Sequence, residues 1–357
     1  MSNKSFSSKR FRNIGVLTIA SVYFLILVGG VVRSTGSGMG CPDWPKCFGS
    51  WVPPTNVSQL PTNYLEVYKN KRIQKNEKLA GFLKNLGFTQ VAENIFQHPS
   101  QYLETEFNVT KTWIEYLNRL VGVLIGIFIF LTLIYSFPYL KKDPVIFYLS
   151  LFSFVLVGFQ GWLGSLVVST NLLPITVTIH MALALVLVAL LIYAVARSQK
   201  SAFHQLHQEA SNKVYSTFYF VIALSFAQIL LGTQVRELVD IIASELNYTG
   251  RDIWISKIGT TFYIHRTFSA FIFVVNVYLC WQLYALHDAR LSRLANGLLA
   301  CMGVEILVGI IISYFDIPAA LQPIHLVLAT IVFGLQFYML IVYYYAAHNR
   351  VLKLAVR

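Results

Sequence analysis

Three histidines stand in long apolar segments, each close to one end of its segment. His180 lies in "LPITVTIHMALA", His265 in "YIHRTFSAF" and His325 in "QPIHLVLAT". An ionisable side chain in such a segment is rare and usually functional. Imidazole can ligate a metal or haem iron, or exchange a proton near neutral pH. A packed, hydrogen-bonded side chain is the alternative for each histidine taken singly.

The sequence repeats itself, and the histidines occupy matching places in the repeat. The stretch around His325 matches the stretch around His180, and "FYIHR" (262–266) matches "EYLNR" (115–119), so that Asn118 stands opposite His265. Two further matches support the register: Gly29-x3-Arg33 with Gly232-x3-Arg236, and Gln160-x3-Gly164 with Glu305-x3-Gly309. A duplicated unit places corresponding residues around corresponding cavities. The second half therefore offers two histidines to one cavity, and the first half offers one.

The elements that carry these residues are predicted to be transmembrane helices. Hydrophobic residues make up 56% of the 357 residues and charged residues only 12%, which excludes an ordinary soluble domain. About 20 apolar residues span the hydrocarbon core as a helix. Eight segments are long enough: 14–33, 113–136, 145–168, 174–196, 214–236, 260–285, 292–314 and 321–346. The prediction is an all-α membrane protein with eight transmembrane helices in two pseudo-symmetric four-helix bundles.

The distribution of Lys and Arg predicts the orientation. Basic residues gather before residue 13 and in segments 137–144, 197–213, 286–291 and 347–357, whereas the short opposite loops 169–173 and 315–320 have none. Because basic loops stay in the cytoplasm, both termini are expected there. The absence of a transit-like leader favours a bacterial plasma membrane. The net charge of +12 follows from this bias and does not indicate nucleic-acid binding.

Residues 34–112 form one long outer loop. Its segment 68–96 predicts one or two amphipathic helices on the outer surface. Cys41 and Cys47 lie in this loop, where an oxidising compartment permits a disulfide, although two unpaired thiols or a transient redox pair are alternatives. The expected organisation is 1–33 (N-terminus and first helix), 34–112 (outer loop), 113–196 (completion of the first bundle), 197–213 (cytoplasmic linker) and 214–357 (second bundle).

Haem suits the histidines better than zinc or copper does. The chain has no clustered Cys and His ligands of the kind that zinc requires, and copper would call for further His, Met or Cys nearby. A four-helix bundle can hold a porphyrin between two imidazoles. We therefore expect His265 and His325 to be the axial ligands of a b-type haem. His180 alone would hold iron in the first half, because Asn118 is a poor iron ligand.

Charged residues near the ligand positions are further candidates. Glu115 is three residues from Asn118 and is expected to face the same cavity, although an ion pair with Arg119 is the alternative. Arginines at the outer helix ends could bind haem propionates or contact lipid headgroups. These arginines are Arg33, Arg119, Arg236 and Arg266.

The motifs "VVRSTGSGMGCPDWPKCFGSWVP", "WIEYLNR", "LPITVTIHMALA", "YIHRTFSAF" and "QPIHLVLAT" resemble those of the heme A synthase family over nearly the whole chain outside the long loop. The resemblance implies conversion of heme O to heme A by two hydroxylations of the C8 methyl group, followed by dehydration to a formyl. It implies haem b as cofactor on His265 and His325, a substrate site with His180 and Glu115, and outer-loop cysteines that assist activity. The family pattern has histidine where this chain has Asn118.

Heme O is the substrate that this resemblance implies. A heme O synthase (farnesyltransferase) and cytochrome oxidase assembly proteins are expected partners, and the chain could form a homo-oligomer. The main alternative is a membrane b-type cytochrome that passes electrons between quinol and a partner. Such a protein would more naturally hold two six-coordinate haems, which Asn118 argues against. A transporter is a second alternative, but Gly and Pro concentrate at helix ends here rather than at mid-membrane.

Overall fold

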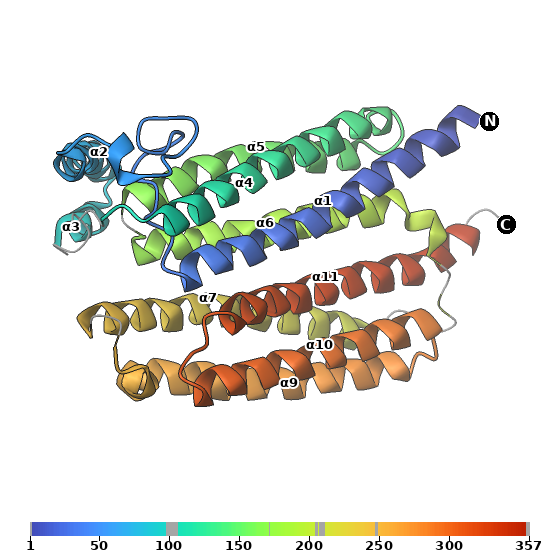
Figure 1. Ribbon diagram of the computed structural model, residues 1–357. Coiled ribbons are helices and arrows are strands. Elements are labelled where there is room, and N and C mark those ends of the chain that lie inside the picture. Colours follow the sequence, from blue (N-terminus) through green and yellow to red (C-terminus); the bar gives the residue numbers. More distant parts are fainter. Residues whose placement is uncertain are drawn as a thin grey trace.

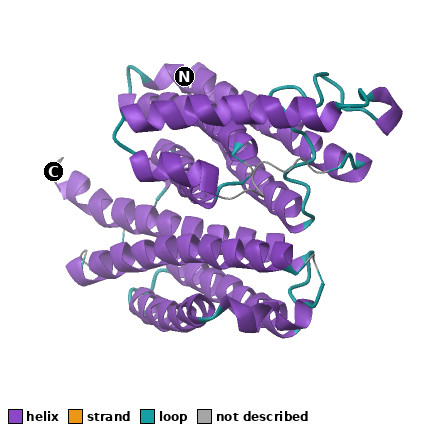
Figure 2. Cartoon of the chain, turned by 90° about the vertical axis from the view of Figure 1, so that its left-hand side faces the viewer, coloured by secondary structure: helices purple, strands orange, loops and turns teal. Residues whose placement is uncertain are grey.

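The computed structural model describes residues 2–97, 106–170, 172–203, 206, 211–246 and 249–354. Regular secondary structure in these residues is helical (Figure 2). Eight helices are long and apolar enough to cross a membrane, which confirms the predicted set. They are α1 (Ser2–Ser34), α4 (Val109–Ser136), α5 (Pro144–Ser169), α6 (Pro174–Ser198), α7 (Asn212–Glu245), α9 (Thr260–Tyr284), α10 (Ala289–Tyr314) and α11 (Leu321–Leu354).

The eight helices form two groups of four (Figure 1). In the first half α1 packs on α4 and α6, and α5 packs on α4 and α6; in the second half α7 packs on α9 and α11, and α10 packs on α9 and α11. The halves meet where α1 and α6 contact α11 and where α6 contacts α7. The four-helix grouping therefore agrees with the duplicated sequence, while pseudo-symmetry between the halves stays a prediction.

Large apolar side chains on the outside of the groups are consistent with a lipid environment. Val123, Val274 and Trp281 are each more than 60% exposed, although each belongs to a predicted transmembrane segment. A contiguous apolar surface of this kind is unfavourable in water and favourable in hydrocarbon. Other apolar side chains are buried between the helices, such as Leu187, Val188 and Leu191 in a cluster of the first half.

Local sequence sets several helix ends. Pro144 and Pro174 stand at the first turns of α5 and α6, where a missing N–H costs nothing. The side chain of Asn108 accepts a hydrogen bond from the Lys111 N–H at the start of α4, and Asp288 does the same at the start of α10 for the N–H of Leu291. These caps fix where α4 and α10 begin.

The second outer loop is shorter than the sequence predicts. Residues 237–245, expected in a loop at 237–259, continue α7 as a helix. Val239 and Ile242 on this extension pack against Trp254 and Ile258 of α8 (Trp254–Ile258). Because the extension has an apolar face and a partner to cover it, the helix does not stop at the predicted membrane boundary.

The long outer loop contains the two expected helices, α2 (Tyr64–Asn85) and α3 (Thr89–Gln97), which lie at the end of the molecule opposite the N-terminus (Figure 1). Ala80 of α2 and Ile95 of α3 pack together with Leu173 at the start of the first-half helix α6. Cys41 and Cys47 form a disulfide, which confirms that prediction. Of the predicted linker 197–213, residues 204–205 and 207–210 lie outside the described residues.

At the opposite end of the first half, Asp143 anchors the α4–α5 turn. Its carboxylate accepts hydrogen bonds from Arg197 at 2.9 and 3.1 Å and from Lys200 at 2.7 Å. Burial alone would raise the pKa of Asp143, but the hydrogen bonds from Lys200 and Arg197 and their positive charges lower it below its usual value. The ion pairs tie α5 to the end of α6 on the predicted cytoplasmic side.

Candidate functional site

Each of the three intramembrane histidines faces a glycine on the neighbouring helix. A Cβ atom at Gly164 of α5 would lie 3.8 Å from Cε1 of His180, and one at Gly232 of α7 would lie 3.4 Å from Cε1 of His265. At Gly309 of α10 the distance to Cε1 of His325 would be only 3.1 Å. The glycines let an imidazole ring approach the backbone of the adjacent helix.

The fourth position of the repeat lacks this arrangement. Gly29 of α1 has no atom within 4 Å of the place where a Cβ would stand. Asn118, which occupies the position equivalent to His265, has a buried side-chain oxygen without a hydrogen-bond partner. The first half thus presents one imidazole and one short amide where the second half presents two imidazoles.

Glutamines on the neighbouring helices fix the backbone at two of the histidines. The amide of Gln160 donates to the carbonyl oxygen of His180 at 3.0 Å, and the amide of Gln228 donates to that of His265 at 2.9 Å. Both glutamines lie four residues before the glycine that faces the ring. One helical turn therefore supplies both the space for the imidazole and a hydrogen bond to its backbone.

Two of the imidazoles have a ring nitrogen without a hydrogen-bond partner. The Nδ1 atoms of His180 and His265 are buried and accept or donate no hydrogen bond. An unsatisfied buried polar group costs about 1–3 kcal/mol, so it usually signals an absent partner. Among the described residues, no group of three or more His, Cys, Asp or Glu side chains could hold a metal ion. A group that needs only axial ligands from the protein remains compatible with this arrangement.

In the second half the two imidazole rings lie near each other in an edge-to-face arrangement. The ring centroids of His265 and His325 are 6.5 Å apart and the ring planes make an angle of 73°. Two metal–imidazole bonds of about 2.0–2.1 Å each would place the ring centroids about 6 Å apart. The observed centroid distance is compatible with one iron atom between α9 and α11, and ligation by this pair stays a prediction.

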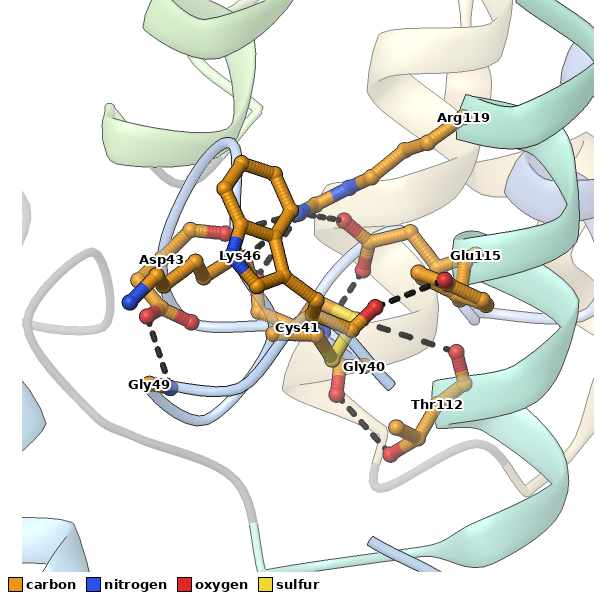
Figure 3. Close-up of a disulfide and its surroundings, with 11 residues drawn as sticks. Gly40, Cys41, Asp43, Lys46, Gly49, Thr112, Glu115 and Arg119 are labelled. Atoms are coloured by element: carbon orange, nitrogen blue, oxygen red, sulfur yellow. Dashed lines mark hydrogen bonds and ion pairs between the residues drawn. A yellow bond between two sulfur atoms is a disulfide. The ribbon is translucent and has the colours of Figure 1, made fainter. Parts of the chain in front are cut away.

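Glu115 is buried beneath the disulfide loop (Figure 3). Its side chain is 4% exposed; one carboxylate oxygen accepts the N–H of Cys41 at 2.8 Å and the other accepts a hydrogen bond from Arg119. The ion pair that the sequence allowed as the alternative for Glu115 is therefore present. It does not exclude a chemical role, because the same contacts place a buried carboxylate beside the disulfide.

Arg119 holds the disulfide loop on α4. Besides Glu115, its guanidinium donates to the carbonyl oxygens of Cys41, Asp43 and Lys46 at 3.2, 2.7 and 2.9 Å (Figure 3). The hydroxyl of Thr112 donates to the carbonyl oxygen of Gly40 at 2.9 Å.

Gly40 is required for this approach, because a Cβ there would lie 2.5 Å from a backbone oxygen of α4. The loop thus covers Glu115 through backbone contacts.

The other arginines have partners that the sequence did not indicate. Arg33 of α1 and Arg236 of α7 both pair with Asp240, at 3.0 and 2.6 Å. This shared carboxylate links the outer ends of the two halves. The guanidinium of Arg266 lies over the rings of Phe262 and Tyr263, 5.8 and 5.2 Å from their centroids. Propionate binding by the four arginines stays a prediction.

Sequence reasoning missed the contacts that connect the loop to Glu115. The N–H of Cys41 and the carboxylate of Glu115 are 74 residues apart in the chain, and no local pattern signals their meeting. Asp240 was also missed, although its place one turn after Arg236 on an extended helix could have indicated an ion pair. Thr178 and Thr233, whose hydroxyls lie 2.8 Å apart, form another contact between the halves.

Comparison with known proteins gives a consistent result. The family model described as COX15-CtaA, cytochrome oxidase assembly protein, matches residues 12–83 and 88–337. Heme A synthase of Shewanella oneidensis is 28% identical over 183 residues, which cover 51% of this chain and 44% of that protein. Heme A synthases of Bartonella tribocorum and Ehrlichia canis are 23% and 25% identical; the matches cover 86% and 89% of this chain and 85% and 89% of those proteins.

Proposed function

Because the chain belongs to the COX15-CtaA family of cytochrome oxidase assembly proteins, we propose that it is a heme A synthase. The reaction is oxidation of the C8 methyl group of heme O to a formyl group. Relatives named heme A synthase match this chain over most of its length, and the spacing of His265 and His325 suits a bound haem. That 6.5 Å spacing is the structural observation that carries the proposal.

The resident cofactor of the second half would be haem b. His265 of α9 and His325 of α11 would hold it, and the glycines at 232 and 309 leave room for the two imidazole rings. Such a haem would supply reversible one-electron transfer. The role of this half would be to take electrons from the substrate.

The first half binds heme O through His180 alone. Asn118 replaces the second imidazole, and neither its short amide nor the empty space at Gly29 supplies a strong iron ligand. A group held from one side can leave more readily than one held from both sides, which suits a substrate that must be released as product. Arg119 belongs to this site as the residue that holds Glu115 and the loop.

Glu115 is the proton-accepting group of the site. Each hydroxylation of the methyl group adds one oxygen from water and releases two protons and two electrons; after two rounds, loss of water leaves the formyl group. The carboxylate of Glu115 accepts a proton from the attacking water. The Arg119 guanidinium and the Cys41 N–H stabilise the ionised carboxylate between turnovers.

Variants of Glu115 and of the second-half histidines test this proposal. In a host that makes heme O, Glu115→Gln is expected to abolish heme A, measured by mass spectrometry of extracted haems, while the protein keeps its low-spin b-type spectrum. His265→Ala and His325→Ala are each expected to remove that spectrum. Normal heme A yield in Glu115→Gln, or a retained spectrum in either histidine variant, would assign the role elsewhere.

The location and partners follow from the same proposal. The protein lies in a bacterial plasma membrane with both termini in the cytoplasm, so that the disulfide and both haem sites lie near the outer face. It receives heme O from a farnesyltransferase and delivers heme A to cytochrome oxidase assembly. The basic segments at the cytoplasmic helix ends support this orientation.

A further inference from the structure

One residue distinguishes the setting of His325 from that of its repeat partner His180. At the equivalent place on the neighbouring helix, the first half has Gln160 and the second half has Glu305. Gln160 binds the backbone oxygen of His180, and Gln228 does the same for His265. Glu305 has no amide to donate, and its carboxylate approaches the imidazole ring instead. Oε1 of Glu305 lies 3.0 Å from Nδ1 of His325.

The carboxylate of Glu305 is directed at this ring. Its side chain is 16% exposed, and its second oxygen, Oε2, is buried without a hydrogen-bond partner. The Nδ1–Oε1 distance is that of a hydrogen bond, but the angle is too poor for one, so that Nδ1 also remains unpartnered by strict geometry. If Nδ1 donates to Glu305, Nε2 is the ring nitrogen that is left to bind iron.

This arrangement has a known chemical consequence in metal sites. A ligating histidine that donates its second ring N–H to a carboxylate becomes a more basic ligand and is held in one orientation. Greater basicity and a nearby negative charge both favour the higher oxidation state of the metal. A glutamine that binds the backbone has neither effect on the ring.

We propose that Glu305 is a positioning residue that accepts the Nδ1–H of His325 and thereby stabilises the ferric form of the second-half haem. It makes the two halves of a duplicated fold electronically different. An iron in the second half would have a lower midpoint potential than it would have beside a glutamine, whereas Gln160 leaves the first-half site without this bias. The inference rests on the proposed ligation by His325, and it goes beyond that ligation because it assigns the property that separates the resident haem from the substrate haem.

The test is the midpoint potential of the low-spin haem in purified protein from a host that makes haem b but no heme O. Glu305→Gln and Glu305→Met remove the charge at similar side-chain length. Each is expected to lower the ferric-to-ferrous ratio at a fixed potential at least tenfold, which is an upward shift of at least 59 mV for one electron. Gln160→Glu places a carboxylate at the equivalent position of the first half. It is expected to change the ferric-to-ferrous ratio of the second-half haem by less than twofold.

The possible results separate the inference from the proposed function. A change of less than twofold in either neutral variant with full haem content overturns the role of Glu305, while the bis-histidine spectrum still supports the ligation. Loss of haem from both neutral variants also overturns it, because Glu305 would then retain the haem rather than tune it. A wild-type protein without any low-spin haem would instead refute the proposed ligation itself.

Discussion

Removal of the Glu115 carboxylate should release the disulfide loop from α4. In the folded protein Cys41 and Cys47 are fully buried, and the loop is attached through Glu115, Arg119 and Thr112. A reductant can reach the disulfide only when the loop opens, so the rate of reduction reports the free energy of opening. Glu115→Ala leaves the N–H of Cys41 unsatisfied and takes the carboxylate away from Arg119.

The expected size of the effect follows from these contacts. An unsatisfied buried N–H costs about 1–3 kcal/mol, and a broken buried ion pair costs about 3–5 kcal/mol. Arg119 keeps three carbonyl partners, so its charge is not left uncompensated and its loss falls below the ion-pair range; with the unsatisfied N–H, we expect about 2–3 kcal/mol in all. Since 1.4 kcal/mol is a factor of ten, reduction should accelerate about 30- to 150-fold.

The assay is mild reduction of purified protein, with the freed thiols trapped by a mass-tagged alkylating reagent over time. Thr112→Val removes one hydrogen bond to Gly40 and should accelerate reduction only about fivefold, for a loss of about 1 kcal/mol. Glu66→Gln changes an exposed carboxyl on α2 and serves as the matched control with the wild-type rate. A Glu115→Ala rate within twofold of the wild-type rate would refute the attachment of the loop through this carboxylate.

Three further outcomes follow from the structure. Asn118→His supplies the missing imidazole and is expected to raise the number of low-spin haems per chain from one to two after loading with heme O, counted by electron paramagnetic resonance. Gly309→Ala places a Cβ 3.1 Å from the ring of His325 and should accelerate haem loss at least tenfold. Gly164→Ala places a Cβ 3.8 Å from Cε1 of His180 and should not affect the second-half haem. Asp143→Asn should lower the melting temperature in detergent at neutral pH. Because folding lowers the pKa of Asp143, the ionised carboxylate stabilises the fold at pH values above its unfolded pKa of about 4. The difference in melting temperature between variant and wild type should therefore shrink as the pH falls below about 4.

Each of these outcomes has a clear contrary result. A single low-spin haem in loaded Asn118→His would show that the two bundles do not place equivalent residues at equivalent sites. Equal haem retention in the two alanine variants would show that the space at Gly309 is not needed to hold the haem. A melting difference for Asp143→Asn that persists undiminished at acid pH would mean that the ion pairs do not stabilise the fold.

The helices and the places of the histidines in them could be predicted because their signals are local. Each membrane segment is an unbroken apolar run, and the repeat aligns His180 with His325 without knowledge of the fold. The sequence showed the glycines opposite the rings as part of the repeat. It did not indicate that they make room for the imidazole rings. The extension of α7 was missed because hydropathy marks the hydrocarbon boundary rather than the end of a helix that continues with an apolar face.

The surroundings of Glu115 could not be predicted, because they depend on contacts between distant parts of the chain. The sequence placed Glu115 on a helix and Cys41 in a loop, but only folding brings the carboxylate to the Cys41 N–H. Likewise, the repeat matched Arg33 with Arg236, yet it did not indicate that Asp240 would pair with both of them.

Conversion of heme O to heme A by this chain is tested most directly by haem extraction. Membranes are prepared from a host that makes heme O but no heme A, with and without the full-length protein, and the extracted haems are separated and their masses measured by mass spectrometry. We expect a formyl porphyrin with the mass of heme A only when the protein is present. Heme O as the sole non-b haem, in membranes that contain the folded protein with its low-spin haem, would contradict it.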